Sequence, residues 1–495
     1  MRIRLVSRQH PDSERVPYSL PVLQLQAVLR AHEEELGFPI VVDRHQLARE
    51  QHPARALRSL TDEAPDVVAL YLDGDDWLAL APIVEAMVSL LPELTVIVGG
   101  PATRGRELEL LQRHPFIEVV LCDEVEVALF ETIAGLHKRK SFPQYRFHDV
   151  LGIAVRNEAG EPELTLERPA VEPLDLLPSP LSGFAEPLIT LGSTAVYETH
   201  RGCRFHCTLC NYGGSFKRRR GFSLERVEAD IAAIDAAGCT ELTLTDALFN
   251  DDPKRTLELV QLFNGSRTLQ RFYANLRADR VTDELHRAFD AKIWSFLCGI
   301  FSTRAETLES LKREMDLDVA RTNIERLIAA GHQVTLQIVA ALPREGWPDL
   351  ARSLDWAISI SGARVRLLPL RIVPGTEMEL HHEGLGLIRG PRSWRSPTLA
   401  TPDLPQAEML RLLGIERLLR WLERDPLSAG PLRGELARHF DSVAEALSQF
   451  LGHLETAGVE CIVGSFESGS GTRALEVNEL VLRDELQRFS ASVAG

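Results

Sequence analysis

Short apolar runs alternate with segments of helical periodicity over residues 1–140. An apolar run bounded by turn residues predicts a buried strand, and apolar residues three or four positions apart predict a helix that packs on it. We expect strands at 3–6, 40–42, 67–72, 94–98 and 117–121, and helices at 23–36, 78–91 and 125–136. This order predicts an α/β fold with a doubly wound parallel sheet, in which ligands bind at the carboxyl ends of the strands.

The pattern weakens over residues 141–190, where prolines gather. Only residues 153–156 have the character of a strand there, and turn residues flank them. We therefore expect a linker that contains a small hairpin.

A second alternation occupies residues 191–385. Strands are expected at 195–198, 242–245, 272–275, 293–300, 334–340 and 365–370. Ser223, Asp252 and Thr282 precede helical segments, and such side chains accept hydrogen bonds from the first backbone N–H groups of a helix. Six strand–helix units in succession predict a partial (β/α)6 barrel of the TIM type, with reactive groups at the carboxyl-terminal rim.

Beyond residue 383 we expect no further strands. Helical spacing predicts helices at 408–421 and 442–454, so residues 386–495 are expected to form a mainly helical C-terminal domain. The chain is thus divided into four parts, at 1–140, 141–190, 191–385 and 386–495.

Composition narrows the classes of function. The 495 residues include 71 acidic and 55 basic side chains, a formal net charge of -16, which disfavours binding to a phosphate backbone as the main activity. The sequence has no apolar run long enough for a membrane span and no apolar core of a signal peptide, so we expect a cytoplasmic protein. Only three of the seven cysteines cluster, which makes a disulfide framework unexpected.

The three clustered cysteines, Cys203, Cys207 and Cys210, form a C-x3-C-x2-C motif directly after the first strand of the second alternation. Three thiolates can hold three irons of a four-iron, four-sulfur cluster and leave the fourth iron open to a ligand. Structural zinc is the alternative, with His200, His206 or a distant cysteine as fourth ligand. The position at the rim of a predicted barrel favours the catalytic cluster.

This motif and its position resemble those of the radical S-adenosylmethionine (SAM) superfamily, and the resemblance covers nearly all of residues 190–385. It implies that the three cysteines hold a 4Fe-4S cluster whose open iron binds SAM. Electron transfer into the sulfonium then yields methionine and a 5'-deoxyadenosyl radical. The resemblance also implies SAM contacts from the loop and the other strand ends, namely from Phe205, Leu209, Asp246, Asn275, Arg277, Gly299, Ser302 and Gln337.

Three of these residues also have a structural interpretation. Asp246 is placed to cap a nearby helix, Arg277 to pair with a surface acid, and Gln337 to serve as a core amide. The chain departs from the family pattern at Phe301, which replaces an acid, and at Ala341 and Arg344, which replace glycines.

The N-terminal part resembles the cobalamin-binding domain of cobalamin-dependent radical SAM enzymes. The resemblance rests on Gly99-Gly100-Pro101 and on residues 119–126, in which Asp123 and Val125 replace two glycines. Glycines without side chains would let a corrin ring approach the backbone. The resemblance implies cobalamin contacts from Asp73, Gly99, Gly100, Pro101, Glu124 and Glu126.

Together these features predict a cobalamin-dependent radical SAM methyltransferase that acts on a small molecule or peptide, in specialised metabolism, with an electron donor such as flavodoxin. Nucleic acid and membrane are not expected as partners. One alternative is a radical SAM enzyme that does not use cobalamin for methyl transfer; another is a non-enzymatic, metal-stabilised binding protein.

The basic run 217–220 is either a solvated surface or a docking site for an acidic donor or substrate. The cysteines outside the motif, at 122, 239, 298 and 461, are expected to be small buried apolar groups.

Overall fold

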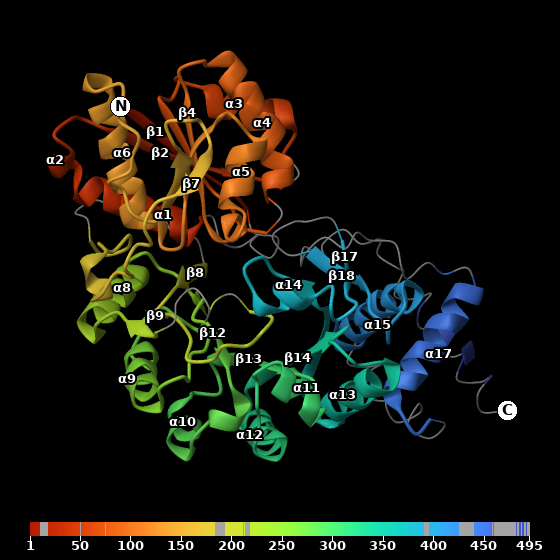
Figure 1. The fold of residues 1–495 in the computed structure, drawn as a ribbon. Helices are drawn as coiled ribbons and strands as arrows, with labels where there is room; N and C mark the ends of the chain where they lie inside the picture. Colours follow the sequence, from red (N-terminus) through yellow and green to blue (C-terminus); the bar gives the residue numbers. More distant parts are fainter. Residues whose placement is uncertain are drawn as a thin grey trace.

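The computed structural model (Figure 1) contains two large sheets, each with its own hydrophobic core. It describes residues 1–9, 18–49, 51–74, 76–183, 194–210, 212, 218–390, 396–424, 440–457, 459, 482, 485, 486, 488, 489 and 492.

The first sheet has seven strands in the order β2-β1-β3-β4-β5-β6-β7. Its parallel part comprises β1 (Arg2–Arg8), β2 (Val41–Leu47), β3 (Val67–Tyr71), β4 (Thr95–Gly99) and β5 (Ile117–Leu121). The expected doubly wound arrangement is present. Helices α1 (Leu20–Ala31), α2 (Glu33–Leu36) and α6 (Val125–Ser141) contribute to the core on one face, and α3 (Pro53–Thr61), α4 (Asp76–Leu90) and α5 (Glu107–Arg113) to the core on the other.

Two details of this sheet differ from the sequence prediction. The helix expected at 23–36 is divided at His32 into α1 and α2. The hairpin expected in a linker, β6 (Ile153–Arg156) and β7 (Pro162–Leu164), is an antiparallel extension of the sheet beyond β5. It satisfies the backbone groups along the outer edge of β5, which would otherwise be unpaired.

The second sheet has six parallel strands in chain order from β8 to β15. They are β8 (Thr194–Tyr197), β11 (Glu241–Leu244), β12 (Arg271–Leu276), β13 (Trp294–Phe301), β14 (Gln333–Ala340) and β15 (Arg364–Pro369). The connecting helices are α8 (Leu224–Ala236), α9 (Pro253–Asn264), α10 (Asp283–Ala288), α11 (Ala305–Ser310), α12 (Leu317–Ala329) and α13 (Trp347–Ser359). The parallel α/β architecture is confirmed, whereas its closure into a partial barrel stays a prediction.

The predicted helix starts are confirmed at atomic detail. Ser223 accepts a hydrogen bond from the Arg226 N–H, Asp252 from the Arg255 N–H and Thr282 from the Leu285 N–H. Each cap satisfies a backbone donor that the first helical turn leaves without a partner.

The expectation that strands stop after residue 383 is wrong. Strands β16 (Arg371–Ile372), β17 (Ile388–Arg389) and β18 (Ser396–Ala400) form a small antiparallel sheet, and α14 (Glu377–His381) lies between the first two along the chain. These strands are short and lack a long apolar run, so their pairing depends on contacts made after folding. The division of the chain into four domains stays a prediction.

Helices α15 (Gln406–Arg424) and α17 (Val443–Thr456) extend the core of the second sheet. Glu416 of α15 accepts a hydrogen bond from the Leu367 N–H at 2.7 Å, and Glu423 accepts one from the Val365 N–H at 3.0 Å. The two carboxylates thus cover the outer edge of β15, the edge away from β14, along which no strand pairs among the described residues.

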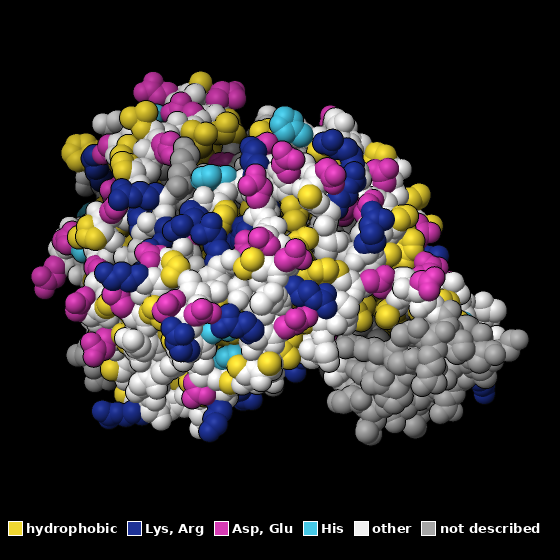
Figure 2. All heavy atoms as spheres, turned by 90° about the horizontal axis from the view of Figure 1, so that it is seen from below, with side chains coloured by type: hydrophobic (Ala, Val, Ile, Leu, Met, Phe, Trp, Pro, Cys, Tyr) yellow, Lys and Arg dark blue, Asp and Glu magenta, His cyan; other side chains and the backbone are white. Residues whose placement is uncertain are grey.

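On the face seen in Figure 2, acidic and basic side chains are interspersed over the described surface. Surface charges also form ion pairs, for example between Arg271 and Glu241. Among the described residues, no helix is both long and apolar enough to cross a membrane.

Candidate active site

The cluster loop, which we define as residues 199–210, begins two residues after β8 and carries all three motif cysteines. Cys207 is buried, Cys203 is half-buried and Cys210 is exposed. Burial, together with the negative charges of Asp251 and the other two thiolates, raises the pKa of Cys203 to about 11. The sulfurs of Cys207 and Cys210 are therefore close enough to affect the ionisation of Cys203.

The donor set suits an iron–sulfur cluster. The Tyr212 N–H donates to Cys210 Sγ at 3.4 Å, and Arg313 Nη1 donates to Cys207 Sγ at 3.8 Å. N–H groups directed at ligand sulfurs are characteristic of iron–sulfur sites. In the part of the chain that the structure describes, no three His, Cys, Asp or Glu side chains are arranged to hold a metal ion.

Asp246, just beyond β11, holds the start of the cluster loop. Its Oδ1 accepts from the backbone N–H groups of Thr199 at 2.7 Å and His200 at 3.2 Å, and its Oδ2 accepts from Thr199 Oγ1 at 2.7 Å. The side chain is 1% exposed. Asp246 does not cap the nearby helix α9, whose N-cap is Asp252. A contact of Asp246 with SAM stays a prediction.

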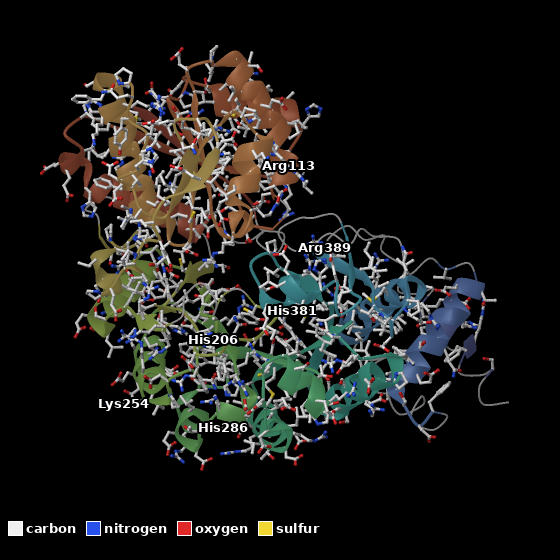
Figure 3. All side chains as sticks on the ribbon, viewed as in Figure 1. Arg113, His206, Lys254, His286, His381 and Arg389 are labelled. Atoms are coloured by element: carbon white, nitrogen blue, oxygen red, sulfur yellow. The ribbon has the colours of Figure 1, made fainter. Side chains whose placement is uncertain are left out.

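Backbone hydrogen bonds clamp the middle of the cluster loop from two sides. The Thr208 N–H donates to the Leu311 carbonyl at 3.1 Å, and the Met378 N–H donates to the Thr208 carbonyl at 2.9 Å. The second bond ties the loop to the start of α14. In Figure 3, His206 of the loop and His381 of α14 accordingly lie on neighbouring elements near the centre of the view.

Arg277 packs against the cluster loop and is buried. Its guanidinium stands 4.5 Å from the centre of the Phe205 ring, and it donates to Asp279 at 2.9 and 2.7 Å and to the Glu314 carbonyl. The predicted pairing with an acid is therefore present, but in the interior rather than at the surface. Its Nη1 has no hydrogen-bond partner among the described atoms.

Arg313 was not singled out by any sequence motif. Its Nη2 donates to the Gly299 carbonyl at 2.5 Å, and its guanidinium stands 3.9 Å from the centre of the Phe301 ring. A Cβ atom on Gly299 would lie 2.8 Å from Phe301 Cε1 and 3.0 Å from Arg313 Nη2, so a larger residue here would displace one of these two side chains. The contact with Cys207 depends on the turn after α11 and is invisible in the sequence.

The remaining predicted SAM contacts are distributed along the strand ends. Asn275 donates to the Asp246 carbonyl at 3.2 Å, so these two residues are adjacent. Ser302 is buried and donates to Glu345 Oε1 at 2.5 Å, and burial raises the pKa of that carboxyl. Leu209 packs against the main core, and Gln337 is half-buried on β14. Their predicted contacts with SAM stay predictions.

The glycines of the N-terminal motif are required by packing. A Cβ atom on Gly99 would lie 2.9 Å from Leu121 Cβ, and one on Gly100 would lie 2.7 Å from the Leu72 carbonyl oxygen. Gly100 also has φ +104°, a conformation that favours glycine. Pro101 begins a short 3₁₀ helix, Pro101–Thr103. These glycines therefore have a structural explanation that needs no corrin.

Asp73 is half-buried at the carboxyl end of β3 and accepts from the Gly74 N–H at 2.8 Å. Asp75, the other acid at this strand end, lies outside the described residues. Contacts of Asp73, Gly99, Gly100 and Pro101 with cobalamin stay predictions.

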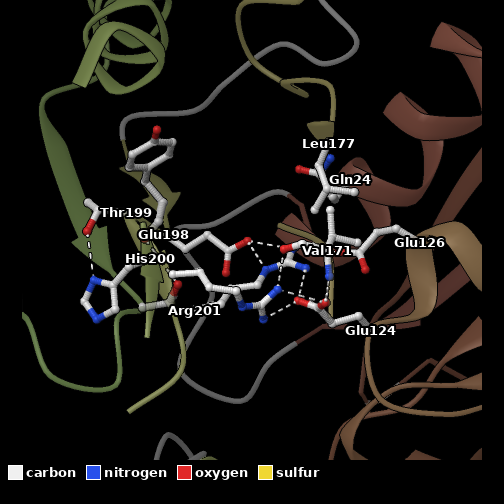
Figure 4. Close-up of polar contacts among 12 residues, drawn as sticks. Gln24, Glu124, Glu126, Val171, Leu177, Glu198, Thr199, His200 and Arg201 are labelled. Carbon is white, nitrogen blue, oxygen red and sulfur yellow. Dashed lines mark hydrogen bonds and ion pairs between the residues drawn. The ribbon is translucent and has the colours of Figure 1, made fainter. Parts of the chain in front are cut away.

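Glu124 and Glu126, predicted to contact cobalamin, bind two arginines of the chain (Figure 4). Glu124 contacts Arg201 and Arg220, and Glu126 contacts Arg201. Although burial raises it, the hydrogen bond from Arg220 and the charge of Arg201 bring the pKa of Glu124 below its usual value. Both carboxylates are thus engaged within the protein, and a corrin contact stays a prediction.

Two arginines of the basic run, Arg219 and Arg220, are ion-paired within the protein rather than fully solvated. Arg220 is buried against Glu124, and Arg219 pairs with Asp252 at 2.9 Å. Arg218 is exposed and lies 3.5 Å from Glu172. Lys217 lies outside the described residues, and docking of a donor stays a prediction.

The other cysteines agree with their expected apolar role where they are described. Cys239 and Cys298 are buried and Cys122 is half-buried. Burial raises the pKa of Cys298 to about 12, which keeps its thiol neutral. Cys461 lies outside the described residues.

No protein-family model matches the chain. The cobalamin-dependent radical SAM methyltransferase TokK of Streptomyces tokunonensis is 27% identical over 358 residues, covering 68% of this chain and 52% of TokK. The 2-(S-pantetheinyl)-carbapenam-3-carboxylate methyltransferase of Streptantibioticus cattleyicolor is 26% identical over 358 residues, with 68% of this chain and 52% of that protein covered. The chain spans about half the length of the curated relatives it matches.

Two solved structures share the fold. The cobalamin-dependent SAM radical enzyme OxsB, with aqua-cobalamin bound, has a TM-score of 0.69 at 14% identity, and the match covers 100% of this chain and 80% of OxsB. The radical SAM methyltransferase TsrM of Kitasatospora setae, with cobalamin and a [4Fe-4S] cluster bound, has a TM-score of 0.65 at 14% identity, and the match covers 100% of both chains. The chain is thus similar in sequence to cobalamin-dependent radical SAM methyltransferases and similar in fold to OxsB and TsrM, in agreement with the resemblance carried by its cysteine motif and N-terminal sheet.

Proposed function

We propose that this protein is a cobalamin-dependent radical SAM methyltransferase. The observation that carries the proposal is the C-x3-C-x2-C loop at the carboxyl end of β8, where N–H groups of Tyr212 and Arg313 point at two of the three sulfurs. Its curated relatives TokK and the carbapenam carboxylate methyltransferase support this assignment.

The residues of the chain have distinct tasks in this function. Cys203, Cys207 and Cys210 would hold a 4Fe-4S cluster, which with SAM supplies one-electron cleavage of the sulfonium. Asp246 and the backbone of Thr208 keep the cluster loop in place through buried hydrogen bonds. Holding the ligand loop rigid keeps reacting groups within a short distance of each other.

The acceptor is proposed to be a carbon atom of a small molecule or peptide, and an electron donor such as flavodoxin is proposed to reduce the cluster. The corrin is proposed to bind to residues 1–140, and the cluster to the cysteine loop within residues 191–385. The N-terminal sheet contacts the cluster loop directly through Glu124 and Glu126, so the two parts face each other at that point.

The decisive experiment is anaerobic reconstitution of the full chain with iron, sulfide and hydroxocobalamin. We expect about four irons and about one corrin per chain, measured by metal analysis and ultraviolet–visible spectra. Reductive cleavage of SAM should follow, and it should be lost in the Cys203→Ala variant. A chain that retains neither iron nor SAM cleavage would contradict the proposal.

A second candidate is a radical SAM enzyme that makes no use of cobalamin. The packing of Gly99 and Gly100 against the chain's own atoms favours it, as does the engagement of Glu124 with arginines. Iron and SAM cleavage without bound corrin, together with a product that has gained no methyl group, would select this candidate over the first.

A further inference from the structure

A buried group of charges joins the first sheet to the cluster loop. Its five members are Glu124, Glu126, Glu198, Arg201 and Arg220, which we call the inter-sheet ion cluster. The side chains of Glu124 and Arg220 are 5% and 4% exposed. Charges at this depth are costly to bury unless they are paired, so their arrangement is strongly constrained.

Glu124 is the centre of the cluster. Its Oε1 accepts from Arg220 Nη2 at 2.8 Å and from Arg201 Nη1 at 3.3 Å, and its Oε2 accepts from Arg220 Nη1 at 3.1 Å. The Val171 N–H completes the set at 2.9 Å. Arg220 thus binds Glu124 through two parallel hydrogen bonds, which fix distance and direction together.

Arg201 is held from two further sides. Its Nη2 donates to Glu126 Oε1 at 2.7 Å and to Glu198 Oε1 at 2.8 Å, and its Nε donates to Glu198 Oε1 at 3.0 Å. Glu126 comes from the first turn of α6, whereas Glu198 immediately follows β8 (Figure 4). The guanidinium therefore bridges the start of α6 and the end of β8.

The two arginines stand at the two ends of the segment that contains the motif cysteines. Arg201 and Arg220 are directly opposite each other in the antiparallel pair of β9 (His200–Arg201) and β10 (Arg220–Gly221). Only Gly202 separates Arg201 from Cys203. Gly202 has φ +92°, and a Cβ atom on it would lie 2.4 Å from the Arg218 carbonyl oxygen, so the chain has little freedom between the arginine and the first ligand.

We propose that Glu124 is a positioning residue for the cysteine ligands: by binding Arg201 and Arg220 at once, it lets the N-terminal sheet determine where the cluster loop stands. This inference rests on the proposed function. The resemblance implied that Glu124 contacts cobalamin. Its carboxylate instead binds two arginines, so we assign it to holding the cluster loop in position.

The test compares the full chain, reconstituted anaerobically with iron and sulfide, as the unmodified protein and as Glu124→Gln. Glutamine keeps the shape of the side chain and removes the charge, which leaves two buried arginines without their shared partner. We expect the electron paramagnetic resonance signal of the reduced cluster to change in shape, and the SAM concentration that half-saturates its SAM-dependent shift to rise at least tenfold. Glu124→Asp retains the charge with a shorter reach and should recover part of both.

Glu118→Gln is the matched control. Glu118 lies on β5 of the same sheet and pairs with Arg139, away from the cluster loop. The electron paramagnetic resonance signal of the Glu118→Gln variant should therefore equal that of the unmodified chain. If Glu124→Gln does not fold, Arg220→Lys serves instead, because lysine keeps the charge and loses the paired hydrogen bonds. Circular dichroism establishes which variants are folded.

An unchanged signal and unchanged SAM dependence in a folded Glu124→Gln or Arg220→Lys protein would overturn the inference. Failure of the unmodified chain to take up a cluster would instead overturn the proposed function. The two failures are therefore distinguishable within one series of samples.

Discussion

Arg313 and Cys207 are 106 residues apart in sequence, and Arg313 Nη1 donates to Cys207 Sγ at 3.8 Å. The same guanidinium is anchored by the Gly299 carbonyl and by the Phe301 ring. One side chain thus connects a cysteine of the motif with the end of β13. A group that hydrogen-bonds to a metal ligand orients that ligand and strengthens metal binding.

Replacement of Arg313 by glutamine should therefore weaken cluster binding. Loss of a group that hydrogen-bonds to a metal ligand commonly lowers metal affinity by about 10- to 100-fold. Iron retained per chain after anaerobic reconstitution and desalting measures the effect. The Arg313→Lys variant should retain more iron than Arg313→Gln and less than the unmodified protein. Lysine keeps the positive charge, but it lacks the planar fork that reaches both Gly299 and Cys207. Arg321→Gln, which removes surface contacts of α12 with Glu325, Ser359 and Trp356 and none with the cysteines, should retain normal iron.

Asp76 should make the stability of the protein depend on pH. Burial raises its pKa to about 6, against an ordinary value of 3.8, although Arg8 and Arg49 lie within 3.6 and 3.8 Å. The folded protein then binds the Asp76 proton more tightly than the unfolded chain does. The stability contributed by the protonated form is complete below pH 3.8 and is lost as the pH rises through about 6.

Asp76→Asn should accordingly raise the free energy of unfolding at pH 8 by up to about 3 kcal/mol, since a shift of about two pKa units corresponds to that energy. The gain should vanish below pH 4. Urea unfolding at several pH values measures it. Glu158→Gln, which changes an exposed acid, should show no such dependence.

Arg344 occupies a position where the resembling family has glycine, and its backbone has φ +62°. Side chains cost about 1 to 2 kcal/mol in this region, and the greater flexibility of glycine in the unfolded chain offsets part of that cost. Because the Arg344 side chain is exposed, Arg344→Gly should stabilise the protein by up to about 1 kcal/mol. Arg344→Ala keeps the Cβ atom and should bring no gain. Thermal unfolding that ranks alanine equal to glycine would contradict this explanation.

Two glycines of the C-terminal helices should respond oppositely to alanine. A Cβ atom on Gly414 of α15 would lie 2.6 Å from Leu451 Cδ2 of α17, whereas one on Gly452 of α17 would meet no atom within 4 Å. Gly414→Ala should therefore destabilise the protein by about 1 to 3 kcal/mol through overpacking. Gly452→Ala should stabilise it by up to about 1 kcal/mol because alanine is the better helix former. Both are measured by denaturant unfolding.

Local patterns were sufficient to predict most of the parallel strands. The limits of β5 agree with the apolar run at 117–121, and Ser223, Asp252 and Thr282 cap the helices expected to follow them. Strands buried on both faces need continuous apolar runs, and helix caps need specific side chains, so both leave a readable signal. The strands β16 to β18 leave none, because short antiparallel strands owe their pairing to neighbours elsewhere in the chain.

The sequence by itself determined the kind of chemistry, because three thiols within eight residues are a local property of the chain. Tertiary structure decided what surrounds them. Glu124 meets Arg201 and Arg220, and Arg313 meets Cys207, across separations of 77, 96 and 106 residues. Burial is the physical reason for these pairings, since a charge removed from water is costly unless an opposite charge or a polar group lies beside it. No local pattern encodes these pairings.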